Sequence, residues 1–470
     1  MVFSSFTFIF LFMPALLLCS YLLPARFRSG RNLILLAFSL FFYGYGGPKF
    51  LLLMLASICV NYLGGLLSAP GRKGRKAAIT VTVSANLLLL GWFKYAGFFG
   101  QTIASVFSAF PVPDVTLPIG ISFFTFQGMS YALDVYRGDT KVQRNPLWIA
   151  LYVSLFPQLV AGPIVRYATV ADEIQTRTEN LSEFSDGLTR FFFGLAKKML
   201  IANQMAALAD AVFAVAPTTL SVTLSWLGAV AYTGQIYFDF SAYSDMAIGL
   251  GKMFGFHFLE NFNYPYISQS ISEFWRRWHI SLSTWFRDYV YIPLGGNRCS
   301  TPRHLLNLLA VWSLTGFWHG AAWNFLLWGL YFFLLLAGER FLWGTQLGKA
   351  PRPLRHVYAL FFIILGWVLF RSESLSYAGG FLSAMFGGGN GFTDRRTIFY
   401  LLQYRYDLLL ALIASLPWKN WLSGWMLRWK TPVSQALQLW IPKFFALAFF
   451  ALSFLRLISS SYNPFIYFRF

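Results

Sequence analysis

The sequence predicts an all-α, polytopic integral membrane protein, and three observations carry that prediction. Of the 470 residues, 57% are hydrophobic and 20% aromatic, and only 12% are charged. The mean hydropathy is +0.55, and a water-soluble domain does not have this composition. Apolar runs that are long enough to cross a hydrocarbon core, which takes roughly 20 helical residues, recur along the whole chain. We therefore expect one integral membrane domain over residues 1–470.

About 11 to 13 hydrophobic segments are expected to form the helical bundle. Two of them, 147–161 and 304–318, are short for a complete crossing, so we expect one or both to be re-entrant and buried within protein. The candidate segments are 6–23, 32–45, 48–68, 77–100, 117–135, 147–161, 187–215, 220–251, 304–318, 320–343, 354–370, 397–417 and 441–459.

The first two basic loops indicate the orientation of the chain in the membrane. Segment 6–23 has no Lys or Arg before it and no small-residue cleavage site after it, so it is expected to remain as a helix. The basic runs Arg26–Arg31 and Gly71–Lys76 follow the first and third spans. The positive-inside rule places both loops in the cytoplasm and the N-terminus outside.

The formal net charge of +19 raises the question of nucleic-acid binding. The basic residues are distributed over short loops between spans rather than over one soluble face, so nucleic acid is not expected as a partner. Cys19, Cys59 and Cys299 give no disulfide framework, and the five histidines follow no ligand spacing. No metal and no bound cofactor are expected.

Residues 261–303 form the longest segment that is neither span nor linker. An amphipathic helix near the membrane surface is expected over 271–291, and the turn "PLGG" ends it. The apolar residues at three- and four-residue spacing are Phe274, Trp278, Leu282 and Trp285. The other side of the helix carries Arg276, Arg277 and Arg287.

His319 lies inside the apolar stretch "SLTGFWHGAAWNFLLWG", residues 313–329. An ionisable side chain within a membrane is costly and suggests a functional site. Gly316 and Gly320 would let backbones approach closely. The side chains expected to wall and orient the imidazole are Trp318, Trp323 and Asn324. From the residue itself, a general base and a histidine that only bonds a neighbouring helix remain equally open.

His279 lies well before His319 in the chain and shares a predicted helix face with Trp275 and Ser283. Only folding could bring the two histidines together. An interfacial histidine in an aromatic belt is the alternative to a site residue. The nearby arginines fit lipid headgroups, or phosphate clamps if the substrate carries phosphates.

Two carboxylates, Asp239 and Asp245, lie in the apolar segment 234–251. Being six residues apart, they do not share a helix face, which argues against a general acid/base pair and for hydrogen bonds between helices or along a cavity. Asp245 is expected to be structural, while a structural role and a cavity-lining role remain equally open for Asp239. No covalent nucleophile or Ser-His-Asp pattern is evident, so direct transfer assisted by a base is the simplest chemistry.

Three stretches, "QIYFDFSAYSDMAIG", "FNYPYISQSISEFWRRWHISLSTWFRDYVYIPLGGNR" and "LTGFWHGAAWNFLLWGLYF", resemble the membrane-bound O-acyltransferase (MBOAT) family, and within it the bacterial alginate O-acetyltransferase branch. The resemblance covers most of the chain. One departure is Ala242, where "FSGYSD" would have glycine.

The resemblance implies a tunnel in which a cytoplasmic acyl thioester, acetyl-CoA or an acyl carrier protein, meets an acceptor hydroxyl from the outer side. It maps the catalytic base onto His319 and an assisting residue onto His279. Expected donor-binding residues are Arg276, Arg277, Arg287 and Trp275, and expected tunnel or support residues are Asp239, Ser241, Trp318 and Asn324.

The implied function is O-acetylation of an exported polysaccharide or a cell-envelope glycan, in the bacterial inner membrane, with an extracytoplasmic acyltransferase as partner. D-alanyl transfer to teichoic acid is the alternative within the class. A transporter or channel is the alternative outside it.

The C-terminal tail, residues 459–470, is too aromatic for a frayed end. Pro464 ends the helix, and the apolar side chains after it cannot all remain in water. They are Phe465, Ile466, Tyr467, Phe468 and Phe470. The tail is expected either to lie in the membrane interface, with Arg469 reaching a headgroup, or to dock a partner.

Overall fold

The regular elements of the described residues are all helices in the computed structural model, which confirms the predicted all-α class. The structure describes residues 1–160, 162–418, 421, 424, 432–460 and 462–466. The chain divides into two compact units, one of residues 1–191 and 243–259, the other of residues 192–242 and 260–470. Two of the three boundaries between the units fall inside helices, one in α10 and one in α12. Whether the chain acts as one domain stays a prediction.

The first unit contains the N-terminal helices. They are α1 Met13–Leu22, α2 Arg28–Gly44, α3 Pro48–Ser68, α4 Arg75–Leu90, α5 Ala96–Ala104, α6 Ile121–Arg137, α7 Pro146–Ser154, α8 Phe156–Leu159, α9 Tyr167–Thr176 and most of α10 Leu181–Ala196. Five-residue π-helical turns, η1 Phe8–Phe12 and η2 Gly91–Tyr95, adjoin α1 and α4. Asn145 caps α7 by accepting a hydrogen bond from Leu147 N at 3.0 Å, with Pro146 as the first helical residue.

The second unit contains the predicted site residues. Its longer helices are α11 Asn203–Phe213, α12 Val222–Met253 up to Ala242, α15 Thr301–His319, α16 Trp323–Gly338, α18 Arg352–Arg371, α19 Leu375–Met385, α20 Arg395–Ala414 and α22 Pro432–Ser459. The shorter elements are η3 Lys197–Ala202, η4 Pro217–Thr219, η5 Pro265–Ile267, α13 Ile271–Arg277, α14 Ile280–Phe286, η6 Arg287–Tyr291, η7 Glu339–Trp343 and α17 Gly344–Lys349.

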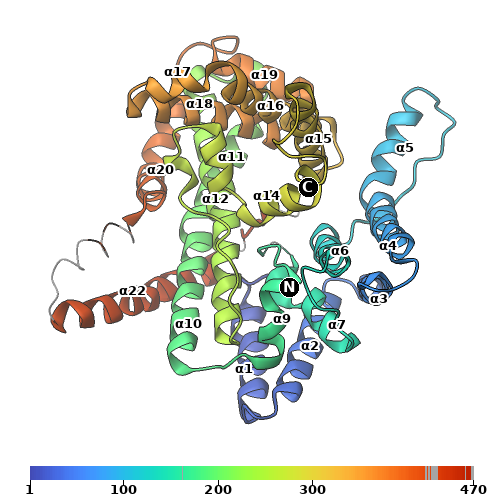
Figure 1. Ribbon diagram of the computed structural model, residues 1–470. Coiled ribbons are helices and arrows are strands. Elements are labelled where there is room, and N and C mark those ends of the chain that lie inside the picture. The colour runs from blue at the N-terminus through green and yellow to red at the C-terminus, as the bar shows by residue number, and fades with distance from the viewer. Residues whose placement is uncertain (161, 419–420, 422–423, 425–431, 461, 467–470) are drawn as a thin grey trace. The chain divides into compact units, whose positions relative to one another are not determined.

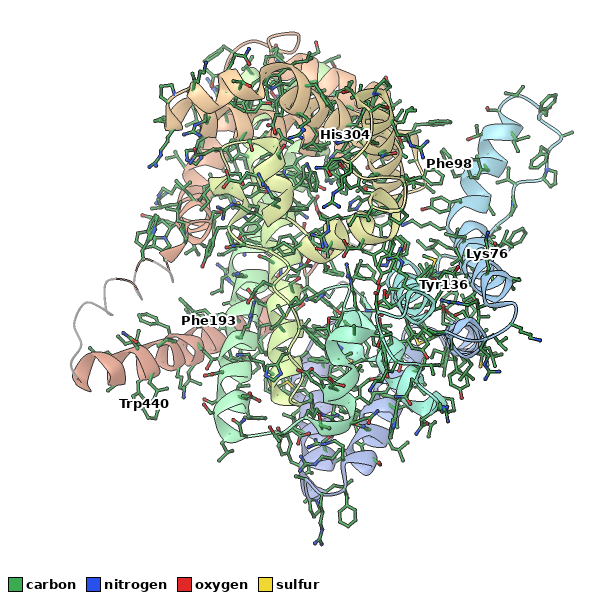
Figure 2. The ribbon with its side chains drawn as sticks, viewed as in Figure 1. Lys76, Phe98, Tyr136, Phe193, His304 and Trp440 are labelled. Carbon is green, nitrogen blue, oxygen red and sulfur yellow. The ribbon has the colours of Figure 1, made fainter. Side chains whose placement is uncertain are left out.

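Six helical stretches among the described residues are long and apolar enough to cross a membrane. They are Pro48–Ser68, Arg75–Ala104, Trp323–Lys349, Arg352–Arg371, Arg395–Ala414 and Ala436–Ser459. Large apolar side chains point outward from them: Trp440 on α22 is 64% exposed (Figure 2). Such outward apolar surface is what lipid covers, so the chain is a multi-pass membrane protein.

The two short segments that we expected to be re-entrant behave differently. Segment 147–161 breaks at Leu155 into α7 and α8, and residues 151–160 are all buried in their unit. Segment 304–318 is instead one continuous helix, α15, which starts three residues earlier than predicted. Whether either segment is re-entrant stays a prediction.

The predicted single helix over 271–291 is wrong. The structure has two short helices, α13 and α14, followed by the π-helical turn η6, and the break lies at Trp278 and His279. Periodicity could not reveal the break, because the four apolar residues of the predicted face are buried on both sides of it (Phe274, Trp278, Leu282 and Trp285).

Helices α15 and α16 lie side by side as a tight hairpin (Figure 1). A Cβ atom on Gly316 would lie 2.3 Å from Phe325 O, and one on Gly329 would lie 2.3 Å from Trp312 O. A Cβ on Gly320 would lie 2.2 Å from the Phe325 ring. The expected close approach at Gly316 and Gly320 is therefore present, and Gly329 completes it from the facing helix.

Candidate active site

His319 is the last residue of α15, immediately before the turn of the hairpin. Its ring is partly buried. The ring centroid lies 5.0 Å from that of Trp318, 5.1 Å from that of Trp328 and 5.2 Å from that of Phe370, each with an edge-to-face arrangement. Aromatic rings from α15, α16 and α18 thus enclose the imidazole, which fixes its position while leaving part of it accessible.

His279 lies between α13 and α14 in a left-handed conformation, with φ 43° and ψ 54°. A non-glycine residue in this region costs about 1–3 kcal/mol and persists where its surroundings hold it. Asn261 supplies that restraint: its carbonyl accepts from Ile280 N at 2.9 Å, and its Oδ1 accepts from Ser281 N at 3.1 Å. The carbonyl of Arg277 accepts from Asn263 N at 2.9 Å on the other side of the break.

The His279 side chain is 4% exposed and lies among aromatic rings. Its ring centroid is 6.1 Å from that of Phe262, 6.4 Å from that of Phe240 and 6.1 Å from that of Trp318. Its Nδ1 has no hydrogen-bond partner among the described residues. Burial of this kind favours the neutral imidazole.

Trp318 is therefore the residue that joins the two histidines. Its indole contacts the His279 ring on one side and the His319 ring on the other. The structure thus brings the two predicted catalytic residues to one aromatic cluster, although they lie far apart in the chain and on different elements. The expected sharing of one helix face by His279, Trp275 and Ser283 is wrong, since the helix is broken at His279.

Trp275 is part of the wall of this cluster. It is 8% exposed, and its ring centroid lies 4.7 Å from that of Trp312, 5.5 Å from that of Trp328 and 4.9 Å from that of Phe332. Because Trp328 also contacts His319, Trp275 supports the imidazole indirectly, through Trp328. Whether Trp275 also contacts the donor stays a prediction.

The three arginines of the amphipathic segment have different surroundings. Arg277 Nε donates to Glu273 Oε1 at 2.9 Å, and Arg287 Nε donates to Asp288 Oδ1 at 2.6 Å. Arg276 uses its Nε on the Ser272 carbonyl, at 3.2 Å, and lines a pocket. Of the three predicted donor-binding arginines, Arg277 and Arg287 are already paired with carboxylates, and Arg276 faces open space.

Asp239 forms a buried ion pair with Lys198: Nζ lies 2.6 Å from Oδ1, and the Lys198 and Asp239 side chains are 4% and 0% exposed. Its other oxygen, Oδ2, accepts from the backbone N–H of Ile466 at 2.8 Å. Asp245 makes a different pair, with Arg190 at 2.8 Å, and its side chain is 17% exposed. Asp245 thus makes the expected bond between helices, and Asp239 links α12, η3 and the C-terminal tail.

The described part of the tail is held inside the second unit. Lys198 Nζ donates to the Pro464 carbonyl, Asn203 Nδ2 donates to Asn463 Oδ1 at 3.2 Å, and Tyr462 Oη donates to Asp210 Oδ2 at 2.7 Å. Phe465 and Ile466 are 7% and 1% exposed. The expectation that these two residues lie in the membrane interface is therefore wrong, whereas docking of a partner by the tail stays a prediction. The calls on Tyr467, Phe468, Arg469 and Phe470 lie outside the described residues.

Three further predicted residues have different surroundings. Asn324 Nδ2 donates to the Ser372 carbonyl at 2.8 Å, so it ties the start of α16 to the end of α18, next to Phe370. It does not orient His319 directly. Trp323 is 52% exposed, and the tryptophan of α16 that contacts the His319 ring is Trp328. Ser241 Oγ is buried with no hydrogen-bond partner among the described residues.

Comparison with known proteins agrees with this geometry. Residues 78–379, which hold both histidines, match the membrane-bound O-acyltransferase family. The chain belongs to that family.

Several relatives from this family are similar over most of their length. One is the "Probable alginate O-acetylase AlgI" of Azotobacter vinelandii, 49% identical over 83% of this chain and 79% of its own. The protein of the same name from Pseudomonas putida is 41% identical over 100% of both chains. The "Peptidoglycan O-acetyltransferase" of Helicobacter pylori is 34% identical over 100% of this chain and 98% of its own. This MBOAT chain is therefore an enzyme, an O-acyltransferase.

Sequence reasoning missed several residues that build the site of this MBOAT protein. Lys198 carried a signal, since an ionisable side chain in the apolar span 187–215 requires a partner. Asn261, Trp328 and Phe370 carried no comparable signal. An amide outside a helix and two aromatic residues in apolar helices look the same in sequence whether or not they surround a reacting group.

Proposed function

We propose that this MBOAT enzyme transfers an acetyl group from cytoplasmic acetyl-CoA to a hydroxyl of an exported polysaccharide or cell-envelope glycan, in the bacterial inner membrane. The observation that carries the proposal is the enclosure of His319 at the tip of the α15–α16 hairpin, in contact with the indole that also contacts His279. The names of the similar proteins point to the same acceptor class, because alginate, peptidoglycan and teichoic acid are all envelope or exported polymers.

The proposed chemistry is direct transfer. A ring nitrogen of His319 takes the proton of the acceptor hydroxyl while the hydroxyl oxygen attacks the thioester carbonyl. The tetrahedral intermediate collapses with cleavage of the carbon–sulfur bond, and the imidazolium returns the proton to the leaving thiolate. The products are an acetyl ester and free coenzyme A.

His279 is proposed to assist from the buried side of the cluster. Its neutral ring can offer a hydrogen bond to the substrate or to the developing oxyanion. The buried Nδ1, which has no hydrogen-bond partner among the described residues, is the atom that we propose for this bond. The restrained left-handed backbone holds the ring in place without a bond to the ring itself.

Delivery of the acetyl group to the glycan is proposed to be direct or to pass through an extracytoplasmic acyltransferase. The alternative of D-alanyl transfer has one observation in its favour. The "Teichoic acid D-alanyltransferase" of Bacillus subtilis is 28% identical over 62% of this chain. The identity to the acetyltransferases is higher and extends further along the chain, so acetyl is the acyl group that we propose.

The test uses the full chain in membrane vesicles with acetyl-CoA labelled on the acetyl carbonyl and, in parallel, a D-alanyl carrier-protein thioester. We expect labelled O-acetyl ester on polysaccharide or on an added partner, released by mild base, and none with His319→Ala. Transfer from the D-alanyl donor alone would replace the acetyl assignment. Labelled solute inside the vesicles without any ester would refute acyl transfer to either acceptor.

A further inference from the structure

His257 lies in the segment after α12, between two of the three stretches that resemble the family, and no motif marks it. Its Nδ1 lies 2.7 Å from Oε1 of Glu173 in α9, and its Nε2 lies 3.2 Å from Oε1 of Glu183 in α10. The backbone N–H of His257 donates to the other oxygen of Glu173, Oε2, at 3.1 Å. These three residues, which we call the His257 clamp, tie the segment after α12 to two other helices of the first unit.

The geometry of the clamp is complete only when the imidazole is protonated. An ionised carboxylate can only accept hydrogen bonds, and a neutral imidazole has one N–H and one nitrogen lone pair. A neutral ring could therefore donate to Glu173 or to Glu183, while the other carboxylate would face the lone pair. The imidazolium donates from both nitrogens, and these bonds are strengthened by charge. One bound proton thus holds the two carboxylates together.

The other charged groups near the clamp are paired with one another. Glu179, which lies in the turn between α9 and α10, forms ion pairs with three arginines. They are Arg28, Arg31 and Arg177. Glu183 Oε2, in contrast, is buried and has no hydrogen-bond partner among the described residues. His257 is therefore the cation that the described contacts assign to Glu183, and its loss would leave that carboxylate without a donor.

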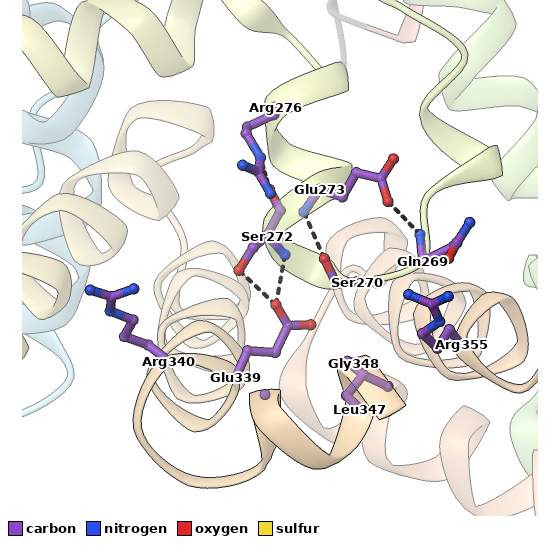
Figure 3. A pocket seen from close by; sticks show the side chains of 11 residues that line it. Gln269, Ser270, Ser272, Glu273, Arg276, Glu339, Arg340, Leu347, Gly348 and Arg355 are labelled. Atoms are coloured by element: carbon purple, nitrogen blue, oxygen red, sulfur yellow. Dashed lines mark hydrogen bonds between the residues drawn. The ribbon is translucent and has the colours of Figure 1, made fainter. Parts of the chain in front are cut away.

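Carboxylates elsewhere in the chain are held by donors that do not titrate near neutral pH. Glu339 accepts from Ser272 N at 2.9 Å and from Ser272 Oγ at 2.6 Å, and Glu273 accepts from Gln269 N at 2.9 Å (Figure 3). Backbone amides and hydroxyl groups keep their protons in this range, whereas an imidazole changes its charge between about pH 5 and 8. The His257 clamp is therefore sensitive to pH in a way that those carboxylate contacts are not.

The direction of the pH effect follows from the pKa of His257. Partial burial acts to lower this pKa, but the hydrogen bonds and charges of Glu173 and Glu183 outweigh it and raise the pKa above its usual value of 6.5. The clamp therefore contributes its full stability below pH 6.5 and loses it as the pH rises through the raised pKa. The His257 side chain is 49% exposed, so protons from solution reach it.

The clamp is expected to face the cytoplasm and to act on the segment that leads to His279. Glu179 pairs with arginines of the basic loop 26–31, which the positive-inside rule places in the cytoplasm. Four residues after His257 the chain reaches Asn261, which holds the left-handed backbone of His279. Four residues extend over about 14 Å at most, so release of His257 gives Asn261 more freedom.

We propose that the His257 clamp is a pH-sensitive regulatory device. At low cytoplasmic pH the protonated ring fixes the segment before Asn261. At high pH the ring loses its proton, the segment is released, and the backbone of His279 is held less firmly. The effect on catalysis rests on the proposed function, whereas the clamp itself does not.

The experiment measures deuterium exchange at the backbone amide of His257, corrected for the intrinsic exchange rate at each pH. The full chain is placed in nanodiscs at about pH 6 and about pH 9, on either side of the range in which an imidazole titrates. His257→Gln removes the titrating ring, and His257→Arg supplies a permanent charge. Glu183→Gln removes one partner, and Asp186→Asn is its matched control, because Asp186 is exposed one turn later in α10.

At about pH 6 we expect the amide to be about tenfold more protected in the wild type than in His257→Gln, as for one hydrogen bond to a charged group. At about pH 9 the two chains should be equally protected. His257→Arg should keep its protection at both pH values. Glu183→Gln should lower the protection at about pH 6, and Asp186→Asn should leave it unchanged.

The kcat for ester formation from acetyl-CoA is measured on the same samples, as the ratio of variant to wild type at each pH, so that the titration of His319 cancels. The ratio for His257→Gln should be below one at about pH 6 and return to one at about pH 9. The proposal is overturned if the protection ratio is the same at both pH values, if Asp186→Asn acts like Glu183→Gln, or if the kcat of an active enzyme does not follow the protection. A chain with pH-dependent protection that forms no ester would refute the proposed function and leave the clamp standing.

Discussion

The two histidine-bearing segments of the second unit reach the same aromatic cluster by different structural means. His319 ends a regular helix, and its position follows from the close packing of Gly316 and Gly329 between α15 and α16. His279 lies where the helix is interrupted, in a left-handed conformation that Asn261 holds from outside. One side chain is therefore placed by helix packing and remains partly accessible, whereas the other is placed by a restrained backbone and is buried.

This difference suggests a division of roles. An accessible imidazole can meet a substrate hydroxyl and exchange protons, and a buried imidazole can hold one hydrogen bond in a fixed direction. The five predictions below address this difference, in order of decreasing expected effect.

The largest effect is expected from removal of the accessible imidazole. His319→Ala should lower kcat for ester formation by about 10² to 10⁴, the usual range for a general base. His279→Ala should lower it about tenfold, as expected for one lost hydrogen bond. Both variants should be assayed as equal amounts of folded protein in nanodiscs. An equal loss in both variants would contradict the division of roles.

The buried ion pair of Asp239 with Lys198 lies on the His279 side of the cluster, because Asp239 is next to Phe240, whose ring contacts His279. Asp239→Ala should lower the free energy of unfolding by about 3–5 kcal/mol, since it leaves the Lys198 charge buried without its partner. Lys198→Met in the same chain should restore part of the loss. Asp245→Ala is the matched control: its pair is partly exposed, so its effect should be clearly smaller, and an equal effect would refute the buried-charge explanation.

Disturbing the glycine contact between α15 and α16, on the His319 side of the cluster, should destabilise the protein less, but by a measurable amount. Gly329→Ala places a methyl group 2.3 Å from Trp312 O, a backbone atom that cannot turn aside, so we expect a destabilisation of about 1–3 kcal/mol in chemical unfolding. Gly379→Ala in α19 is the control, because it meets no atom within 4 Å. Helix propensity should make the control neutral or up to about 1 kcal/mol stabilising. Destabilisation of the control to the same degree would remove the contact as the cause.

The strained backbone at His279 should be detectable by comparing two substitutions that both remove the ring. His279→Gly should be more stable than His279→Ala by about 1 kcal/mol, because glycine adopts the left-handed conformation without a Cβ penalty. At Thr284, inside α14, the order should be reversed. Thermal unfolding of the four variants measures both differences in stability. If the alanine variant is more stable than the glycine variant at both positions, the backbone at His279 is not strained.

The smallest effect is expected at Arg277, whose partner Glu273 shares its partial exposure. Arg277→Gln should change the free energy of unfolding by less than about 1 kcal/mol and leave the KM for acetyl-CoA unchanged. Steady-state kinetics with acetyl-CoA measure the second quantity. A rise in KM of about tenfold, as expected for one lost hydrogen bond to a charged group, would return Arg277 to the donor-binding residues.

The all-α class and most helical segments could be predicted from the sequence, and the two histidines could be selected from it as candidate site residues. A run of apolar residues indicates by itself that the segment is buried in protein or covered by lipid. An imidazole within such a run is noticeable because an ionisable side chain is energetically costly there. Gly316 and Gly320 were predictable for the same reason, since a missing side chain in an apolar helix permits close approach.

The tertiary structure alone decided the break at His279, the pairing of Asp239 with Lys198 and the burial of Phe465 and Ile466. The left-handed conformation depends on Asn261, which lies outside α13 and α14, and Asp239 depends on partners in η3 and in the C-terminal tail. The spacing of apolar residues indicates which face of one segment is buried. It does not indicate which backbone group or charged side chain from a distant part of the chain contacts that face, because hydrogen bonds and ion pairs depend on distances that only the folded chain sets.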